Sequence, residues 1–211
     1  MQDFLQDINE YCERNSTSQD ALLNQIERAT HLETLAPRML SGSMQGMLLT
    51  LISKMVAPKV ILEIGTFTGY SAICLAKGLR AGGKLITIEY NEESAHIAHR
   101  FIAESPYSQH IDLIHGDAKL IIPTLDMEFD LVFIDADKDA YGLYYDMVIN
   151  KCKSGSIILA DNVLWSGKVL DAEPDRKTAA LVSFNEKIVL DDRVENVILP
   201  IRDGINLIRK I

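Results

Sequence analysis

Between residues 60 and 161, short β-rich runs alternate with segments of helical length and composition. The runs are VILEI at 60–64, KLITIE at 84–89, IDLI at 111–114, FDLVFID at 129–135 and SIILAD at 156–161. Parallel strands need crossover connections of about this length, and helices in those connections cover both faces of the sheet. The pattern therefore predicts an α/β fold with a doubly wound, mostly parallel sheet.

The connecting segments predict helices at about 71–79, 92–103, 118–125 and 140–149, and another helix is expected at 176–190. After it, the runs ENVILPI and INLIRKI flank Arg202, Asp203 and Gly204. An Asp-Gly pair between two β-rich runs is typical of a hairpin. The expected sheet thus has seven strands and ends in an antiparallel pair.

Ahead of the sheet, apolar residues recur at helical spacing in the segments 4–12, 22–29 and 44–55. Pro37 separates the second helix from the third, and Pro58 ends the third. No linker or repeat divides the chain. We therefore expect a single domain over 1–211, with residues 1–36 as an N-terminal helical extension and residues 37–211 as its core.

The charge balance narrows the choice of partners and compartment. The 211 residues include 30 acidic and 21 basic side chains, so the net charge is -9. Such a field repels nucleic acid and anionic membranes. The acidic N-terminus does not look like a signal peptide, no run is apolar enough to span a bilayer, and the three cysteines have no paired spacing. These features predict a cytoplasmic protein with reduced thiols and no membrane partner.

Ligands of open parallel sheets bind beyond the carboxyl ends of the strands. The first strand ends in EIGTFTGYS, whose Gly65 and Gly69 allow a tight turn close to a ligand. The second strand ends in Glu89, which could accept hydrogen bonds from ribose hydroxyls. An adenosine-type ligand is one interpretation. A tight strand-to-helix turn beside a solvated Glu is an equally weighted alternative.

The type of nucleoside cofactor follows from what replaces the glycines. Phe67 and Tyr70 stand where a dinucleotide fingerprint needs its second and third glycines, which disfavours NAD. Glu63 beneath the turn would repel a pyrophosphate but suits an ammonium or a sulfonium. The cofactor favoured by these residues is S-adenosylmethionine (SAM).

Oxygen donors gather where the fourth and fifth strands end, in DADKD at 135–139 and in Asp161 and Asn162. Carboxylate and amide oxygens without His or Cys suit a hard cation such as Mg²⁺. Capping of helices or turns by these acids is the alternative, with about even weight. Trp165, the single tryptophan, could wall a flat substrate or pack in the core.

Four segments, PRMLSGSMQGMLL, LEIGTFTGYS, FIDADKDAY and ADNVLWSG, together with the closing ILPIRDGINLIRK, occur in one characteristic order. In this the chain resembles the cation-dependent, SAM-using O-methyltransferases that include caffeoyl-CoA and catechol O-methyltransferases. The resemblance runs from about residue 30 to the C-terminus. It implies a Rossmann-like methyltransferase fold and favours the metal interpretation.

The resemblance also implies roles for single residues. Asp135, Asp161 and Asn162 match the metal ligands, for Mg²⁺ or another divalent cation such as Mn²⁺ or Ca²⁺. Lys138 matches the lysine that takes the proton from the reacting hydroxyl, with Asp135 as the second catalytic residue and Trp165 as a further substrate contact. The positions that match cofactor contacts are Met39, Ser41, Glu63, Gly65, Thr66, Ser71, Glu89, Asp117, Ala118, Asp135, Asp137 and Tyr141.

The expected activity is therefore methyl transfer from SAM to a hydroxyl of a small vicinal dihydroxyaromatic, by a homodimer. Two alternatives stay open: methylation of a hydroxylated tRNA nucleoside, with a basic patch of Arg14, Arg28, Arg38 and Arg100, and a non-catalytic cofactor-binding protein. Lys138 could instead only pair with Asp137 or Asp139. The segment 166–177 is shorter than in plant members, so acceptance of CoA thioesters also stays open.

Overall fold

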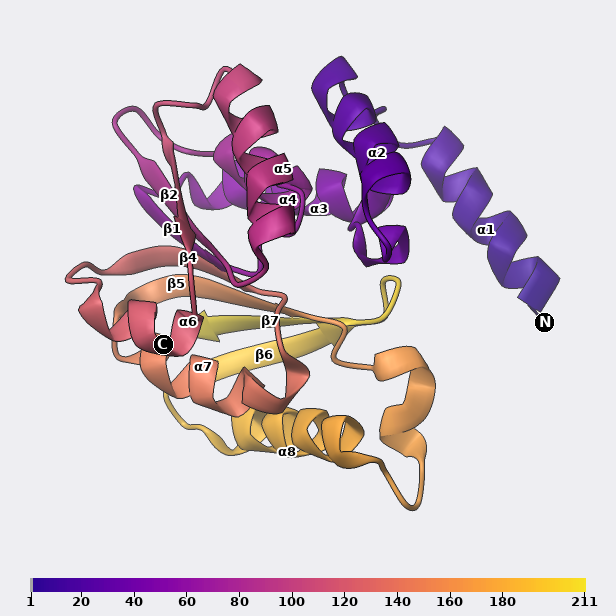
Figure 1. Ribbon diagram of the computed structural model, residues 1–211. Coiled ribbons are helices and arrows are strands. Elements are labelled where there is room, and N and C mark those ends of the chain that lie inside the picture. The colour runs from indigo at the N-terminus through magenta and orange to yellow at the C-terminus, as the bar shows by residue number, and fades with distance from the viewer. Residues whose placement is uncertain (1) are drawn as a thin grey trace.

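The structure, a computed structural model, describes residues 2–211, with side chains from residue 7 onward. A seven-stranded sheet in the order β3-β2-β1-β4-β5-β7-β6 forms its centre (Figure 1). The strands are β1 (Val60–Ile64), β2 (Lys84–Glu89), β3 (Ile111–His115), β4 (Phe129–Ile134), β5 (Cys152–Asp161), β6 (Val194–Leu199) and β7 (Ile205–Lys210). The first five pair in parallel, and β7 is antiparallel to both β5 and β6. The predicted fold class is confirmed.

Helices cover both faces of this sheet (Figure 1). They are α1 (Gln2–Arg14), α2 (Ala21–Glu33), α3 (Gly42–Val56), α4 (Tyr70–Ala76), α5 (Glu92–Glu104), α6 (Ala118–Ile121), α7 (Tyr141–Ile149) and α8 (Arg176–Leu190). Helices α2 to α5 enclose one hydrophobic cluster, and α6 to α8 enclose the other. On β1, Ile61 belongs to the first cluster and Leu62 to the second, as alternating strand faces require.

The chain crosses from one side of β1 to the other between β3 and β4. From β1 it runs outward through β2 to β3, then returns to place β4 on the opposite side of β1. The strand order therefore reverses between β1 and β4, and their carboxyl ends flank the crevice in which ligands of open α/β sheets bind.

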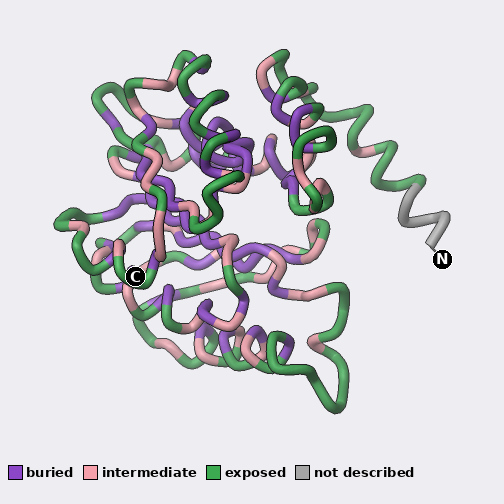
Figure 2. Tube along the Cα trace, in the orientation of Figure 1, coloured by how far each residue is buried: buried purple, intermediate pink, exposed green. Residues whose placement is uncertain are grey.

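The two leading helices differ in how they pack. On α2, Leu23 and Ile26 are buried in the cluster shared with α4. Helix α1 extends outward, and its side chains from residue 7 onward are mostly exposed, including those of Ile8 and Tyr11 (Figure 2). The predicted helices at 4–12 and 22–29 are confirmed as helices, and the side chains of Phe4 and Leu5 lie outside the described residues.

Predicted and observed boundaries differ most at two places, and the helix expected at about 71–79 also ends earlier, at Ala76. The helix expected at 118–125 ends at Ile121 and continues as a 3-10 turn, because Pro123 has no N–H to donate to a helical carbonyl. Strand β5 begins at Cys152 rather than at residue 156, with a shift of register against β4 and with Gly155 at φ 87°.

The described cysteines form no disulfide: Cys74 and Cys152 are buried thiols and Cys12 is partly buried. Across residues 2–211, no helix has the length and apolarity needed to cross a membrane.

Candidate functional site

The predicted cofactor turn and the predicted metal residues meet at the carboxyl ends of β1, β4 and β5. Backbone hydrogen bonds continue past the strands, from Asp135 N–H to the Ile64 carbonyl and from Gly65 N–H to the Ile88 carbonyl, each at 2.9 Å. Gly65 has φ 98°, and a Cβ at this position would lie 2.0 Å from the Asp135 carbonyl oxygen. Only glycine allows so close an approach between the two strand ends.

Glu63 is fully buried beneath this turn. Its Oε2 accepts a hydrogen bond from the Thr87 hydroxyl at 2.5 Å, and Thr87 also contacts the Thr66 hydroxyl. Oε1 has no hydrogen-bond partner among the described residues. Burial raises the pKa of Glu63 to about 8. A cationic donor placed at Oε1 would satisfy this oxygen and favour the charged form.

The expected ribose and adenine positions are neighbours. Glu89 accepts N–H bonds from Phe67 at 2.7 Å and from Asn91 at 2.8 Å, one on each oxygen, so each keeps a lone pair. Gly116 N–H donates to the Glu89 carbonyl at 2.8 Å. The next residue, Asp117, caps α6 by accepting from Lys119 N–H at 2.9 Å, and Ala118 is buried.

Lys138 lies in a buried polar cluster after β4. Its Nζ donates to Asp135 Oδ1 at 2.8 Å and to the Tyr141 hydroxyl at 2.6 Å. The Tyr141 hydroxyl is fully buried and donates to the Asp161 carbonyl at 2.9 Å. Tyr141 is thus committed to contacts within the protein that orient Lys138.

The alternative pairing of Lys138 with Asp137 or Asp139 is wrong. Asp137 is exposed and caps the 3-10 turn at Lys138–Ala140. Asp139 pairs with Arg176 at 2.6 Å. The carboxylate that pairs with Lys138 is therefore Asp135.

Asp161 is held by a residue that the sequence did not single out. Oδ2 accepts a hydrogen bond from Gln45 Nε2 at 2.5 Å, and Oδ1 accepts from Asn162 N–H at 2.8 Å. Burial, and then the negative charge of Asp135, raise the pKa of Asp161. Gln45 sits inside the apolar stripe of α3, and its one signal was a polar residue at a core-facing position. Thr87 was missed for the same reason, within a buried strand.

The chemistry of the predicted metal ligands fits a hard cation. In the part of the chain that the structure describes, no three His, Cys, Asp or Glu side chains converge as a metal centre. Asp135, Asp161 and Asn162 instead combine two carboxylates with an amide, and the carboxylates repel each other. Oxygen donors that carry excess negative charge are typical of Mg²⁺ or Ca²⁺ sites.

The remaining candidates lie around this centre. Ser41 and Ser71 are buried, and Met39 is 58% exposed just ahead of α3. Trp165 begins the 3-10 segment Trp165–Leu170 and packs, half-buried, against the cluster under α7 and α8. The core interpretation of Trp165 is therefore supported, and its contact with a substrate stays a prediction.

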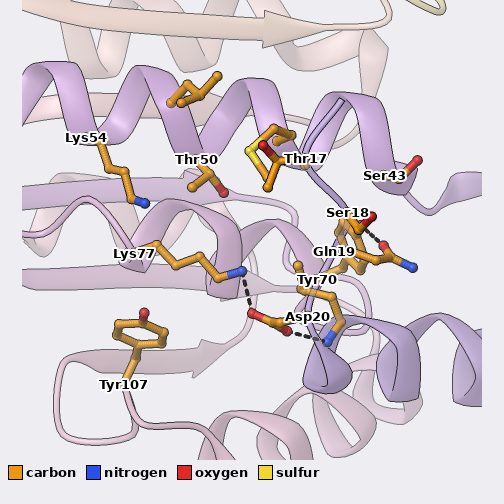
Figure 3. A pocket seen from close by; sticks show the side chains of 14 residues that line it. Thr17, Ser18, Gln19, Asp20, Ser43, Thr50, Lys54, Tyr70, Lys77 and Tyr107 are labelled. Atoms are coloured by element: carbon orange, nitrogen blue, oxygen red, sulfur yellow. Dashed lines mark hydrogen bonds and ion pairs between the residues drawn. The ribbon is translucent and has the colours of Figure 1, made fainter. Parts of the chain in front are cut away.

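A pocket of about 440 Å³ lies away from these residues, between the segment 17–20, α3 and α4 (Figure 3). Lys77 and Asp20 form an ion pair at 2.7 Å in its wall. None of the predicted site residues lines this pocket.

Comparisons with known proteins agree with the geometry. A sequence model of the O-methyltransferase family matches residues 13–211. Caffeoyl-CoA O-methyltransferase of Mesembryanthemum crystallinum is 35% identical over 190 residues, which cover 82% of this chain and 73% of the relative. The structure is similar to TomG of Streptomyces achromogenes, an O-methyltransferase involved in tomaymycin synthesis and solved with SAM, with 29% identity, a TM-score of 0.90, and 97% and 96% of the two chains covered. It is also similar to the SAH-bound methyltransferase PaMTH1 of Podospora anserina, with 28% sequence identity and a TM-score of 0.90. The match covers 99% of this chain and 96% of PaMTH1.

Proposed function

The chain belongs to the O-methyltransferase family, as a SAM-dependent enzyme of the caffeoyl-CoA O-methyltransferase type. From this premise, we propose that it methylates one hydroxyl of a small catechol-like acceptor held by a divalent cation. The reaction breaks the bond between the sulfonium sulfur and its methyl group and forms a bond from that methyl to the acceptor oxygen. The hydroxyl proton leaves, and S-adenosylhomocysteine (SAH) is released.

The cofactor part of the proposal rests on Glu63 and its neighbours. The unpartnered Oε1 of Glu63 is an acceptor for the ammonium of the methionine end, whose positive charge favours the ionised carboxylate. Glu89 keeps lone pairs for the ribose hydroxyls at the end of β2. Asp117 and Ala118, at the end of β3, border the adenine in this proposal.

Asp135, Asp161 and Asn162 are the residues that would hold the cation. When bound, a divalent cation orients the two hydroxyls of a catechol and lowers the pKa of the one that attacks. Gln45 and Asn162 N–H hold the Asp161 carboxylate in a fixed direction. Holding the acceptor oxygen in line with the sulfonium methyl contributes up to about 7–11 kcal/mol to lowering the barrier.

Lys138, as the neutral amine, is the proposed acceptor of the hydroxyl proton, and it becomes an ammonium that pairs with Asp135. Its Nζ lies between Asp135 and Tyr141. The whole residue is only 7% exposed, so water has little access to it. The Tyr141 hydroxyl keeps the side chain from turning toward solvent. General-base assistance of this kind contributes about 10²–10⁴-fold to a rate.

The observation that carries the proposal is the meeting of Asp135, Asp161 and Lys138 beside the Glu63 turn. The test is a labelled-methyl SAM assay over a panel of catechols, with and without EDTA. We expect EDTA to abolish methylation, added Mg²⁺, Mn²⁺ or Ca²⁺ to restore it, and D161A with N162A to prevent the restoration. D192A, at an exposed position, is the matched control.

Methylation that persists in EDTA would contradict the proposed requirement for a divalent cation. A hydroxylated tRNA nucleoside is the alternative acceptor, and turnover of tRNA without turnover of any catechol would replace the proposed one. The basic patch expected for tRNA is weakened because Arg100 pairs with Glu33 at 2.9 Å.

A further inference from the structure

The turn between β6 and β7 contacts two segments that border the site. Arg202 Nη1 donates a hydrogen bond to the Leu40 carbonyl at 2.8 Å, across 162 positions of the sequence. In Figure 1 this turn reaches from the sheet toward the chain just ahead of α3. No motif in the sequence pointed to this contact.

The first segment, residues 39–41, leads into α3. Leu40 lies between Met39 and Ser41, the two positions expected to border the cofactor. Gly42 follows with φ 74°, and a Cβ there would lie 3.3 Å from Arg202 Nη1. The guanidinium therefore packs directly against the start of the helix that carries Gln45 to Asp161.

The second segment, residues 163–166, follows Asp161 and Asn162. Val163 N–H donates to the Gly204 carbonyl at 3.1 Å, Leu164 N–H donates to the Asp203 carbonyl at 2.9 Å, and Ser166 N–H donates to the Asp203 carboxylate. Trp165 and Ser166 have φ 48° and 54°. Residues other than glycine rarely adopt such backbone angles, so the contacts from the turn hold this segment in its conformation.

Arg202 is itself left-handed, with φ 50°. Glycine adopts this conformation without a steric penalty, whereas arginine does not. The hydrogen bond from the guanidinium to Leu40 offsets part of that penalty. Side chain and backbone at this position can therefore be tested separately.

We propose that Arg202 is a positioning residue for methyl transfer: it holds residues 39–41 on the same turn whose Asp203 and Gly204 hold residues 163–166. The turn thereby sets the spacing between the cofactor side and the acceptor side of the site. This inference rests on the proposed function, together with the expectation that Met39 and Ser41 border the cofactor and that Trp165 contacts the acceptor.

Three substitutions separate the contact from the backbone. R202G removes the donor and also the steric penalty of the left-handed conformation, because glycine adopts it freely. R202M removes the donor and keeps the penalty. R202K retains the charge and one donor group. R209A is the matched control, because Arg209 lies on the same hairpin and pairs with Glu195 in an exposed ion pair.

The dissociation constant for SAH, measured by calorimetry, is the first readout. We expect R202G and R202M to bind SAH about 3- to 30-fold more weakly, R202K to recover part of the affinity, and R209A to match the wild type. The KM for SAM should rise in parallel. A merely structural role would lower the melting temperature and the folded fraction but leave the dissociation constant of the folded protein unchanged.

Wild-type affinity for SAH in both R202G and R202M would overturn the proposal, whatever the acceptor. If no catechol is methylated but the Arg202 variants still lose SAH affinity, the acceptor is wrong and the positioning role stands. If the wild-type protein fails to bind SAH, both proposals fall.

Discussion

Gln45 Nε2 donates a hydrogen bond to Asp161 Oδ2 at 2.5 Å, although the two residues are 116 positions apart. Gln45 is 1% exposed and Asp161 is 2% exposed. The bond joins α3 on one face of the sheet to the end of β5, and it offsets part of the cost of burying a carboxylate that Asp135 also repels.

Removing this donor should destabilise the protein. Q45M keeps the length of the side chain and leaves Asp161 Oδ2 buried without its partner, so we expect the free energy of unfolding to fall by about 1–3 kcal/mol. Urea denaturation in EDTA measures it. K54M, at an exposed position of the same helix, should stay within about 0.5 kcal/mol of the wild type. Equal stability of Q45M and K54M would contradict the role given to Gln45.

Replacement of Lys138 should affect turnover more than cofactor binding. K138M removes the proposed proton acceptor, and we expect kcat to fall about a hundredfold or more while the SAH dissociation constant changes little. Steady-state kinetics, corrected for the folded fraction by circular dichroism, give the comparison. K54M, at an exposed lysine of α3, is the control. A kcat within threefold of the wild type, about 0.6 kcal/mol, would exclude Lys138 as the base.

Glu63 should make stability fall with rising pH in the absence of cofactor. An unfolded chain releases this proton near pH 4.5, whereas the buried carboxyl holds it to about pH 8. The free energy of unfolding therefore decreases between these values as pH rises, by an amount on the order of 3 kcal/mol.

E63Q should remove this decrease, so that its stability relative to the wild type grows from pH 5 to pH 8. At the same time its SAH affinity should drop, since the amide cannot carry the charge. Denaturant titrations across this pH range give the slope. E104Q, on the exposed side of α5, should retain the wild-type slope. Parallel pH profiles for E63Q and the wild type would contradict the assignment.

Asp191 should have the opposite effect on the pH dependence of stability: its contribution should be lost as the pH falls. Arg193 donates to both of its oxygens, at 2.8 and 2.6 Å, and the Tyr145 hydroxyl donates at 2.7 Å. The hydrogen bonds from Arg193 and Tyr145 hold the pKa of Asp191 well below its usual value. Its contribution is therefore present above about pH 4 and is lost as the pH falls toward the lowered pKa.

D191N should consequently be less stable than the wild type at pH 7, by about 1–2 kcal/mol, and the difference should shrink only in strong acid. Thermal unfolding from pH 2 to pH 7 measures this. D192N, at the exposed neighbouring position, is the matched control. A difference that vanishes already at pH 5 would show that the Asp191 cluster is not stabilising.

The strands were predictable because each corresponds to a local pattern of residue types in the sequence. The runs at 60–64 and 84–89 match β1 and β2 residue for residue, since a strand buried on both faces needs a continuous apolar run ended by turn residues. Two features were not predicted. The 3-10 turn after α6 depends on how the chain continues around Pro123, and the early start of β5 depends on a register shift against the neighbouring strand β4.

The sequence by itself determined the α/β order of elements, the glycine turn after β1 and the acidic residues at the strand ends, because local periodicity and residue type decide these features. Only the tertiary structure decided which distant groups meet: Gln45 with Asp161, Thr87 with Glu63, and Arg202 with Leu40. A hydrogen bond between distant residues depends on the packing of whole helices and strands, and no local pattern encodes that distance.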